Sequence, residues 1–168
     1  LVVAAFARVK NKYPTAKLVI IGAMDGYPAL YEELNLDITD FKISDAVNMC
    51  GAVNRRELSK WLSKAHVALL PSSFEGFSIA TLEYTFFALP SLLSATGASR
   101  ELANKYHGIG VVSECAVPLE NLSVEAIEAN ASKPREEAIV ALSNSMCVFL
   151  NDYAAKLEAS IQAALDYP

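Results

Sequence analysis

Short apolar runs alternate along the chain with longer stretches in which apolar residues recur every three or four positions. Runs rich in leucine and β-branched residues that end at glycine or proline are typical of buried parallel strands, whereas the longer period predicts amphipathic helices. We therefore expect strands at residues 17–22, 46–51, 67–71, 90–94 and 110–112. We expect helices at residues 1–12, 27–36, 55–64, 77–89 and 99–106, and helical structure from residue 121 to the end.

The alternation of strands with helical stretches predicts βαβ units, in which helices cover a parallel sheet. The expected fold class is α/β, a doubly wound Rossmann-like parallel sheet with helices on both faces. We expect one domain over residues 1–168, with an α/β core at 1–113 and C-terminal helices at 121–168. Residues 115–135 are expected to form a surface linker. Ligands of such sheets bind beyond the carboxyl ends of the strands, so the candidate chemistry is expected there.

One polar loop follows a predicted strand at such an end. The strand ends at Pro71, Glu75 and Gly76 lie in the loop, and the next helix begins near Phe77. The first turn of a helix has free N–H groups and a partial positive charge, which suit a phosphate group or a sugar hydroxyl. A glycine allows the backbone to come close to a ligand. The sequence therefore indicates a ligand site on this loop.

The helix predicted at residues 77–89 is apolar nearly all round, and we therefore expect it to be buried. Glu83 is the only charged side chain between Phe77 and Ser99. An ionised carboxylate in apolar surroundings is costly unless it is paired or hydrogen-bonded. Its partner is either a buried cation or a ligand hydroxyl that arrives on binding, and the spacing alone leaves both open.

Composition and charge narrow the classes of function. The 168 residues carry a net charge of −5 with acidic and basic residues mixed, so nucleic acid is not an expected partner. No apolar run approaches the ~18–20 residues that span a bilayer, and the chain does not begin like a secretory signal. The 3 cysteines and 2 histidines are widely spaced, which predicts neither a disulfide framework nor a metal site and favours a reducing, cytoplasmic compartment. The start at Leu1, inside a predicted helix, suggests an excised segment.

The loop and the helix after it carry an ordered motif. Proline and serine end the strand, Glu-Gly-Phe follows, and a second glutamate stands eight positions after the first: Pro71, Ser72, Glu75, Gly76, Phe77 and Glu83. Further matches follow the same order along the chain: KLVIIG at 17–22, CGAVNRREL at 50–58, Leu89-Pro90, Gly97 and Glu101. Over residues 1–112 the sequence resembles the C-terminal domain of family 4 glycosyltransferases, which have the two-domain GT-B fold.

The resemblance implies a role for each matching residue in binding a nucleotide-sugar donor. Glu75 is the implied catalytic residue and holds hydroxyls of the donor hexose, while Glu83 accepts hydrogen bonds from the ribose. A carboxylate forms short, charge-assisted bonds with vicinal hydroxyls, which suits it to both tasks. Backbone N–H groups at the helix start meet the sugar or diphosphate, and the backbone around Val53 lies against the base. The implied donor-binding set is Glu75, Gly76, Phe77, Ser78, Ile79, Glu83 and Val53.

The resemblance also implies the reaction. Such a retaining enzyme transfers a hexose from a UDP- or GDP-sugar to a polysaccharide, glycolipid or protein acceptor, with no metal ion and no cofactor. The first strand of the domain, a basic pair that binds the diphosphate, and the acceptor domain are expected before Leu1, so this chain alone is expected to be inactive. The implied location is the cytoplasm, with contact to the inner membrane surface only through the missing domain.

Departures from the family pattern support an alternative. Phe86, Phe87 and Ala88 stand where the family has small residues and a glycine, and Ser78 replaces a frequent glycine. The aromatic residues favour a non-catalytic partner subunit or acceptor-binding module with the same fold, whereas the intact pair of glutamates favours the transferase. A third class is an unrelated Rossmann-like domain, such as the receiver domain of a response regulator, which would need an acidic cluster after the first strand that the sequence lacks.

Overall fold

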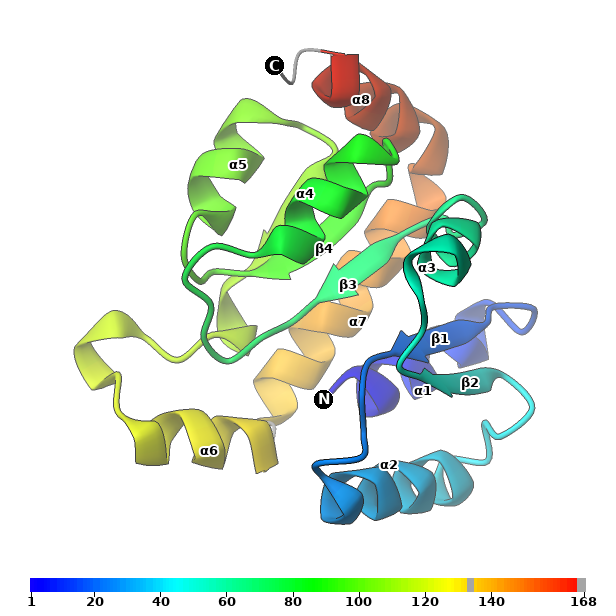
Figure 1. Cartoon of the computed structure of the whole chain (residues 1–168), viewed down its shortest axis with the longest axis vertical. Helices are drawn as coiled ribbons and strands as arrows, with labels where there is room; N and C mark the ends of the chain where they lie inside the picture. Colours follow the sequence, from blue (N-terminus) through cyan, green and yellow to red (C-terminus); the bar gives the residue numbers. More distant parts are fainter. Residues whose placement is uncertain (133–134, 166–168) are drawn as a thin grey trace.

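The structure is a computed structural model that describes residues 1–132 and 135–165 and has an α/β fold (Figure 1). Its helices are α1 (Val2–Lys12), α2 (Pro28–Asp40), α3 (Arg55–Leu62), α4 (Ile79–Phe86), α5 (Ser99–Lys105), α6 (Val124–Ser132), α7 (Glu136–Asn151) and α8 (Tyr153–Leu165), with the short 3-10 helices η1 (Ser113–Cys115) and η2 (Leu119–Asn121). Its strands are β1 (Leu18–Ile21), β2 (Val47–Gly51), β3 (Ala68–Leu70), β4 (Ser91–Ser94) and β5 (Ile109–Val112). None of these described helices is long and apolar enough to cross a bilayer.

All strand pairs are parallel, as the alternation of elements predicts. In one sheet β1 pairs with β2, and Leu18 lies opposite Val47. In the other sheet β4 lies between β3 and β5, and Leu92 lies opposite Leu69 on one side and Gly110 on the other. Neighbouring parallel strands end at the same edge of a sheet. The loops after β3, β4 and β5 therefore meet at one end of the three-stranded sheet.

The predicted doubly wound α/β class is confirmed, with its strands divided between two sheets. Within the described ranges no ladder joins β1 to β3. In a doubly wound sheet the first strand lies centrally, flanked by the second and the fourth. If β1, β2 and β3 are the second, third and fourth strands of such a sheet, its first strand would lie between β1 and β3. No described residues fill that place. Burial agrees, because β4 is buried at every position, whereas β1 and β3, although more apolar, bury only their first residue.

Helices α1 and α7 pack together and supply half of the buried residues of the main core. Figure 1 shows α1 behind β1 and α7 behind the three-stranded sheet. The cluster joins Phe6 of α1 and the α7 residues Leu142 and Phe149 to Leu18 of β1 and Leu92 of β4. Because the cluster takes residues from both sheets, these two helices hold the sheets in one body.

Helix α4 is shorter than predicted and is not buried all round. Thr81 and Thr85 are buried, and the Thr85 hydroxyl donates to the Thr81 carbonyl at 3.0 Å. In contrast, Ile79 is 71% exposed and Phe86 is 82% exposed. The prediction of a buried helix is therefore wrong. The helix packs through Thr81, Thr85 and the partly buried Tyr84, and it leaves Ile79 and Phe86 in solvent.

The predicted surface linker at 115–135 is wrong for its first three residues, whereas 118 and 120–125 are exposed and 133–134 lie outside the described residues. Cys115, Ala116 and Val117 are buried, and Cys115 belongs to the main core. The 3-10 helix η1 packs against α7, which brings these small apolar side chains under cover. Helix α6 follows within the same stretch. The prediction failed because burial here depends on a helix that comes later in the chain.

Candidate functional site

The candidate site centres on the loop that joins β3 to α4, residues 71–78, which we call the donor loop after the role that the resemblance implies for it. Strand β3 ends at Leu70 and helix α4 begins at Ile79, so the loop lies at the carboxyl edge of the three-stranded sheet. The sequence placed the site at this edge. Groups from three other segments of the fold hold the loop there.

Ser94, the last residue of β4, fixes the start of the donor loop. It is buried, and its Oγ donates to the Ser72 carbonyl at 2.5 Å and lies 3.5 Å from the Leu70 carbonyl. The Thr96 hydroxyl lies 3.4 Å from the Ser94 Oγ. Because a hydroxyl has one proton, the shorter contact with Ser72 is the one that fixes the loop. The loop is thereby tied to the central strand of its sheet.

Gly97, in the turn between β4 and α5, lies directly against the donor loop. A Cβ added to Gly97 would stand 1.9 Å from the carbonyl oxygen of Gly76 and 2.9 Å from that of Glu75. Gly97 also has a φ of +50°, in the left-handed region that favours glycine. Both conditions require glycine at this position. The backbone of the loop is therefore seated on the turn that follows β4.

Two groups from the segments after β5 hold Ser73 of the donor loop. The Val117 N–H donates to the Ser73 carbonyl at 3.1 Å. The side-chain amide of Asn130, in α6, donates to the Ser73 hydroxyl and to the Cys115 carbonyl, each at 3.0 Å. Neither Val117 nor Asn130 could be found from the sequence, because both lie far from the motif and no local pattern connects them with it.

The two glutamates of the motif are both half-buried. The Ser72 hydroxyl donates to Oε1 of Glu75 at 3.1 Å, which orients that carboxylate. Burial raises the pKa of the Tyr84 phenol, and the negative charges of Glu83 and Glu75 raise that pKa further. Glu83 is the neighbour of Tyr84 in the chain, and Glu75 acts on the same phenol from the donor loop.

Glu83 forms no ion pair among the described residues. The ion pairs in these ranges join other side chains, such as Arg8 with Glu136 and Arg135 with Glu137. Of the two partners that the sequence left open for Glu83, the buried cation is therefore not seen in residues 1–132 and 135–165. An ionised carboxylate has acceptor sites on both oxygens, which a ligand hydroxyl can use.

The first turn of α4 lies between the two glutamates in the chain. Ser78 caps the helix, since its Oγ accepts from the Thr81 N–H at 3.4 Å. The other N–H groups of a first turn have no partner within their helix and give this end a partial positive charge. Phe74, Phe77 and Ile79 are exposed around it. The arrangement offers hydrogen-bond donors, two carboxylates and an apolar rim.

Val53 stands apart from the other predicted donor-binding residues, which all lie in the donor loop or in α4. It is half-buried in the connection between β2 and α3, on the other sheet. The next residue, Asn54, caps α3, and its side chain accepts from the Glu57 N–H at 3.0 Å. The backbone at Val53 is therefore fixed by the start of a helix, and none of the hydrogen bonds found among the described residues joins it to the donor loop.

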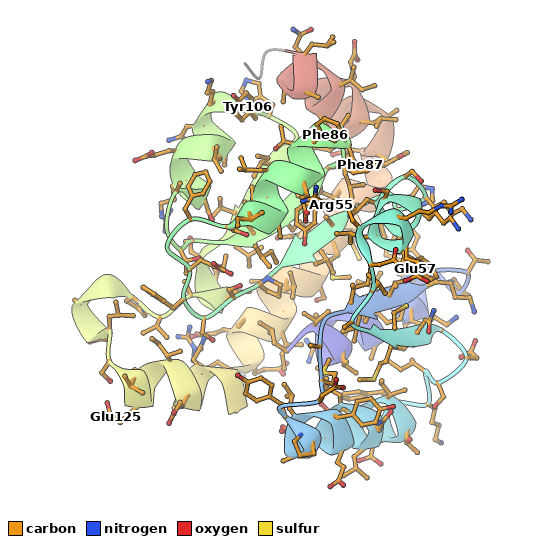
Figure 2. The ribbon with its side chains drawn as sticks, in the orientation of Figure 1. Arg55, Glu57, Phe86, Phe87, Tyr106 and Glu125 are labelled. Atoms are coloured by element: carbon orange, nitrogen blue, oxygen red, sulfur yellow. The ribbon has the colours of Figure 1, made fainter. Side chains whose placement is uncertain are left out.

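The aromatic departures from the family pattern lie away from the donor loop. Figure 2 shows Phe86 and Phe87 at the carboxyl end of α4. Their ring centroids are 5.6 Å apart with the ring planes at 73°, an edge-to-face contact. Phe86 and Phe87 therefore do not replace any residue of the donor loop.

Two surface hollows lie elsewhere on the molecule. The larger, about 480 Å³, is lined mainly by His107 and residues of α7 and α8, and the smaller, about 180 Å³, by Lys64 and residues of α3 that include Trp61. The donor loop lines neither of them. In the described part of the chain, no group of three or more His, Cys, Asp and Glu side chains is placed to hold a metal ion.

Comparison with known sequences gives a family and a relative. The family described as "Glycosyl transferases group 1" matches residues 1–138. The MMP alpha-(1->4)-mannosyltransferase of Mycolicibacterium hassiacum is 34% identical over 79 residues, which cover 47% of this chain and 18% of that protein. The family match includes the donor loop, α4 and the segments that hold the loop.

Solved structures share the fold at low sequence identity. Sucrose-phosphate synthase of Thermosynechococcus elongatus aligns with a TM-score of 0.69 at 16% identity, over 97% of this chain and 37% of that one. HepE of Anabaena, in complex with UDP, aligns with a TM-score of 0.59 at 14% identity, over 98% of this chain and 44% of that one. The chain therefore spans less than half the length of each of these proteins.

Proposed function

Because this chain belongs to the group 1 glycosyl transferases, we propose that it binds the nucleotide-sugar donor of a retaining hexosyltransferase. On this proposal it is the C-terminal domain of a family 4 enzyme with the two-domain GT-B fold. The donor is a UDP- or GDP-hexose, and the acceptor is a glycan, a glycolipid or a protein. The structure of HepE, which has a similar fold, contains UDP, and this supports a nucleotide donor.

The observation that carries the proposal is the donor loop itself, in which the Ser72 hydroxyl orients the half-buried carboxylate of Glu75 just before the capped start of α4, with the half-buried Glu83 further along the same helix. Glu75 accepts hydrogen bonds from hydroxyls of the hexose, and Glu83 accepts them from the ribose. Both are charge-assisted bonds to paired hydroxyls, which are stronger than bonds between neutral groups. Glu83 forms no ion pair in the described ranges, so both of its oxygens can accept hydrogen bonds from a ligand hydroxyl. The backbone at Val53 faces the base.

The start of α4 meets the diphosphate. The backbone N–H groups of Phe77, Ser78 and Ile79 supply donors there, and no atom lies within 4 Å of the place where Gly76 would carry a Cβ. Negative charge grows on the diphosphate as its bond to the sugar breaks, and the positive end of a helix stabilises that charge. Glu75 holds the hexose with its anomeric carbon toward the acceptor, which is catalysis by positioning. The reaction as proposed uses no cofactor.

Other parts of the enzyme are assigned to the rest of a longer protein. The half-buried, apolar edges of β1 and β3 suit a further parallel strand between them, and we place there a strand that precedes Leu1. The basic pair that binds the diphosphate and the acceptor domain are assigned to the same missing part. This chain alone is then expected to lack transfer activity. We assign the enzyme to the cytoplasm, where it reaches the membrane surface only through the other domain.

Donor turnover by the full-length protein tests the proposal. The protein is incubated with UDP- and GDP-hexoses and a panel of acceptors, and release of free UDP or GDP is followed. The anomeric configuration of the product is read by NMR. We expect release from one class of donor and a product that keeps the donor's anomeric configuration. A folded full-length protein that releases no nucleotide from any donor contradicts the transferase.

A second candidate function is the non-catalytic partner subunit. Phe86 is 82% exposed and forms an edge-to-face pair with Phe87. Exposed aromatic side chains are common at protein–protein contacts, so this pair favours a partner surface. If the protein is such a partner subunit, we expect the full-length protein to form a stable complex with a catalytic subunit and to show no turnover of its own. The transferase predicts turnover in the isolated full-length protein.

A further inference from the structure

The donor loop is held by two separate parts of the fold. Ser94 and Gly97 hold it from the end of β4 and the turn after it. The second hold comes from the segments after β5, through the Val117 N–H and the side chain of Asn130 in α6. We propose that Asn130 is a positioning residue of the donor site, which keeps the loop in the shape that binds the nucleotide sugar. The proposal rests on the function proposed above for this loop.

The Asn130 amide uses both of its protons. Nδ2 donates to the Ser73 hydroxyl and to the Cys115 carbonyl, each at 3.0 Å. Cys115 is 1% exposed and belongs to the main core, so its carbonyl is a fixed point. Asn130 is itself half-buried, which limits competition from water for these bonds. One side chain thus connects the core with the residue two positions before Glu75.

Helix α6 lies at the edge of the fold (Figure 1). In the described ranges it packs extensively against no other helix or strand. Figure 2 shows Glu125 at the end of α6 that lies away from the sheet, whereas Asn130 lies near the other end. The two half-buried hydrogen bonds of Asn130 add little packing to a helix at the edge of the fold. We therefore assign this pair to the loop that it holds.

The hydrogen bonds to Ser73 fix both its backbone and its side chain. Val117 holds the carbonyl at 3.1 Å while Asn130 holds the hydroxyl. A loop that is ordered before its ligand arrives loses less conformational entropy on binding, and it presents its groups in the productive geometry. Without the Asn130 amide, Glu75 is still present, but the backbone that carries it samples more conformations. Donor affinity then falls although no group that contacts the donor is lost.

Two variants at this position and one control test the proposal. Asn130→Ala removes both hydrogen bonds, and Asn130→Asp keeps the shape but turns an acceptor toward the Cys115 carbonyl. Asn144→Ala makes the same truncation at an exposed position of α7. For each variant of the full-length protein, we would measure hydrogen exchange of the amides of residues 75–77, the affinity for UDP- and GDP-hexoses by calorimetry, and the melting temperature.

Both Asn130 variants should speed exchange at residues 75–77 about tenfold and weaken donor affinity about five- to tenfold, as expected for the loss of one or two hydrogen bonds. Their melting temperatures should stay near that of Asn144→Ala. Unchanged exchange at residues 75–77 in Asn130→Ala overturns the proposal. Faster exchange spread over the whole three-stranded sheet also overturns it, because that marks a general structural role. If the wild-type protein binds no nucleotide sugar, the proposed function fails, and the role of Asn130 in the donor site fails with it.

Discussion

Gly97 and Gly76 lie against each other with no room for a side chain between them, since a Cβ on Gly97 would lie 1.9 Å from the Gly76 carbonyl oxygen. Gly97 follows β4 and Gly76 follows β3, so the contact joins the loops of two neighbouring strands. It fixes the backbone next to Glu75 relative to the sheet. The geometry of the candidate site thus depends on a glycine outside the donor loop.

Gly97→Ala should displace the donor loop. The left-handed φ of Gly97 costs an alanine about 1–2 kcal/mol, and the clash with the Gly76 carbonyl forces a further shift. We expect a lower melting temperature and donor affinity reduced about tenfold or more, as for other misplaced site geometry. Gly26→Ala is the control, because no atom lies within 4 Å of its added Cβ. Equal effects of the two substitutions would contradict the contact.

The free edges of β1 and β3 should be visible in hydrogen exchange. The Leu18 N–H donates to the Ala46 carbonyl, and the Ala68 N–H donates to the Pro90 carbonyl. Successive N–H groups of a strand point to opposite sides, so the N–H groups of Val19 and Leu69 point away from the paired strands. In the 168-residue chain we expect their amides to exchange fast. In the full-length protein, where a further strand is proposed between β1 and β3, they should be protected. Equal rates in the two proteins would count against that strand.

The stability of the fold should fall at alkaline pH because of Cys115. Burial raises the pKa of its thiol from 9.0 to about 11, so the folded state holds the proton more tightly than the unfolded state does. Its contribution to stability is therefore complete below pH 9 and is lost as the pH rises toward 11, by at most about 1.4 kcal/mol per pH unit. Urea unfolding at pH 8, 9 and 10 should show a steeper decline for the wild type than for Cys115→Ala. Parallel declines would show that the buried thiol is not the cause.

Removal of divalent metal should leave the transfer rate of the full-length enzyme unchanged. In the proposed reaction, the N–H groups and the positive end of α4 stabilise the negative charge of the leaving diphosphate. Rates are measured in EDTA and again after excess Mg²⁺ is added. A rate that falls in EDTA and returns with Mg²⁺ would mean that a metal ion stabilises the leaving diphosphate instead.

The order of the elements and the place of the site could be predicted because both follow from local patterns. The run 17–22 is apolar, β-branched and closed by glycine, and it forms β1 with little change of bounds. The donor loop was visible because its proline, glycine and glutamate stand between an apolar strand and a helix start. Residues 75–79 follow one another in the chain, so their proximity needs no tertiary information.

Features that depend on contacts between distant segments could not be predicted. Asn130 lies 57 positions from Ser73, and nothing in the sequence of α6 points to that partner. The exposure of Ile79 and Phe86 was missed because an apolar helix does not reveal which of its faces a neighbour covers. The burial of Cys115 depends on α7, which comes later in the chain.

The central claim is that Glu83 binds the donor ribose and is not a structural residue. Calorimetric titration of the full-length protein with UDP- and GDP-hexoses, for the wild type and Glu83→Gln, tests it directly. Glu32→Gln, at an exposed position of α2, is the matched control. The account predicts that Glu83→Gln loses about 1–3 kcal/mol of donor binding free energy, the usual loss for a charged hydrogen bond, while its melting temperature stays near that of the control. Unchanged donor affinity together with a large fall in melting temperature would contradict it.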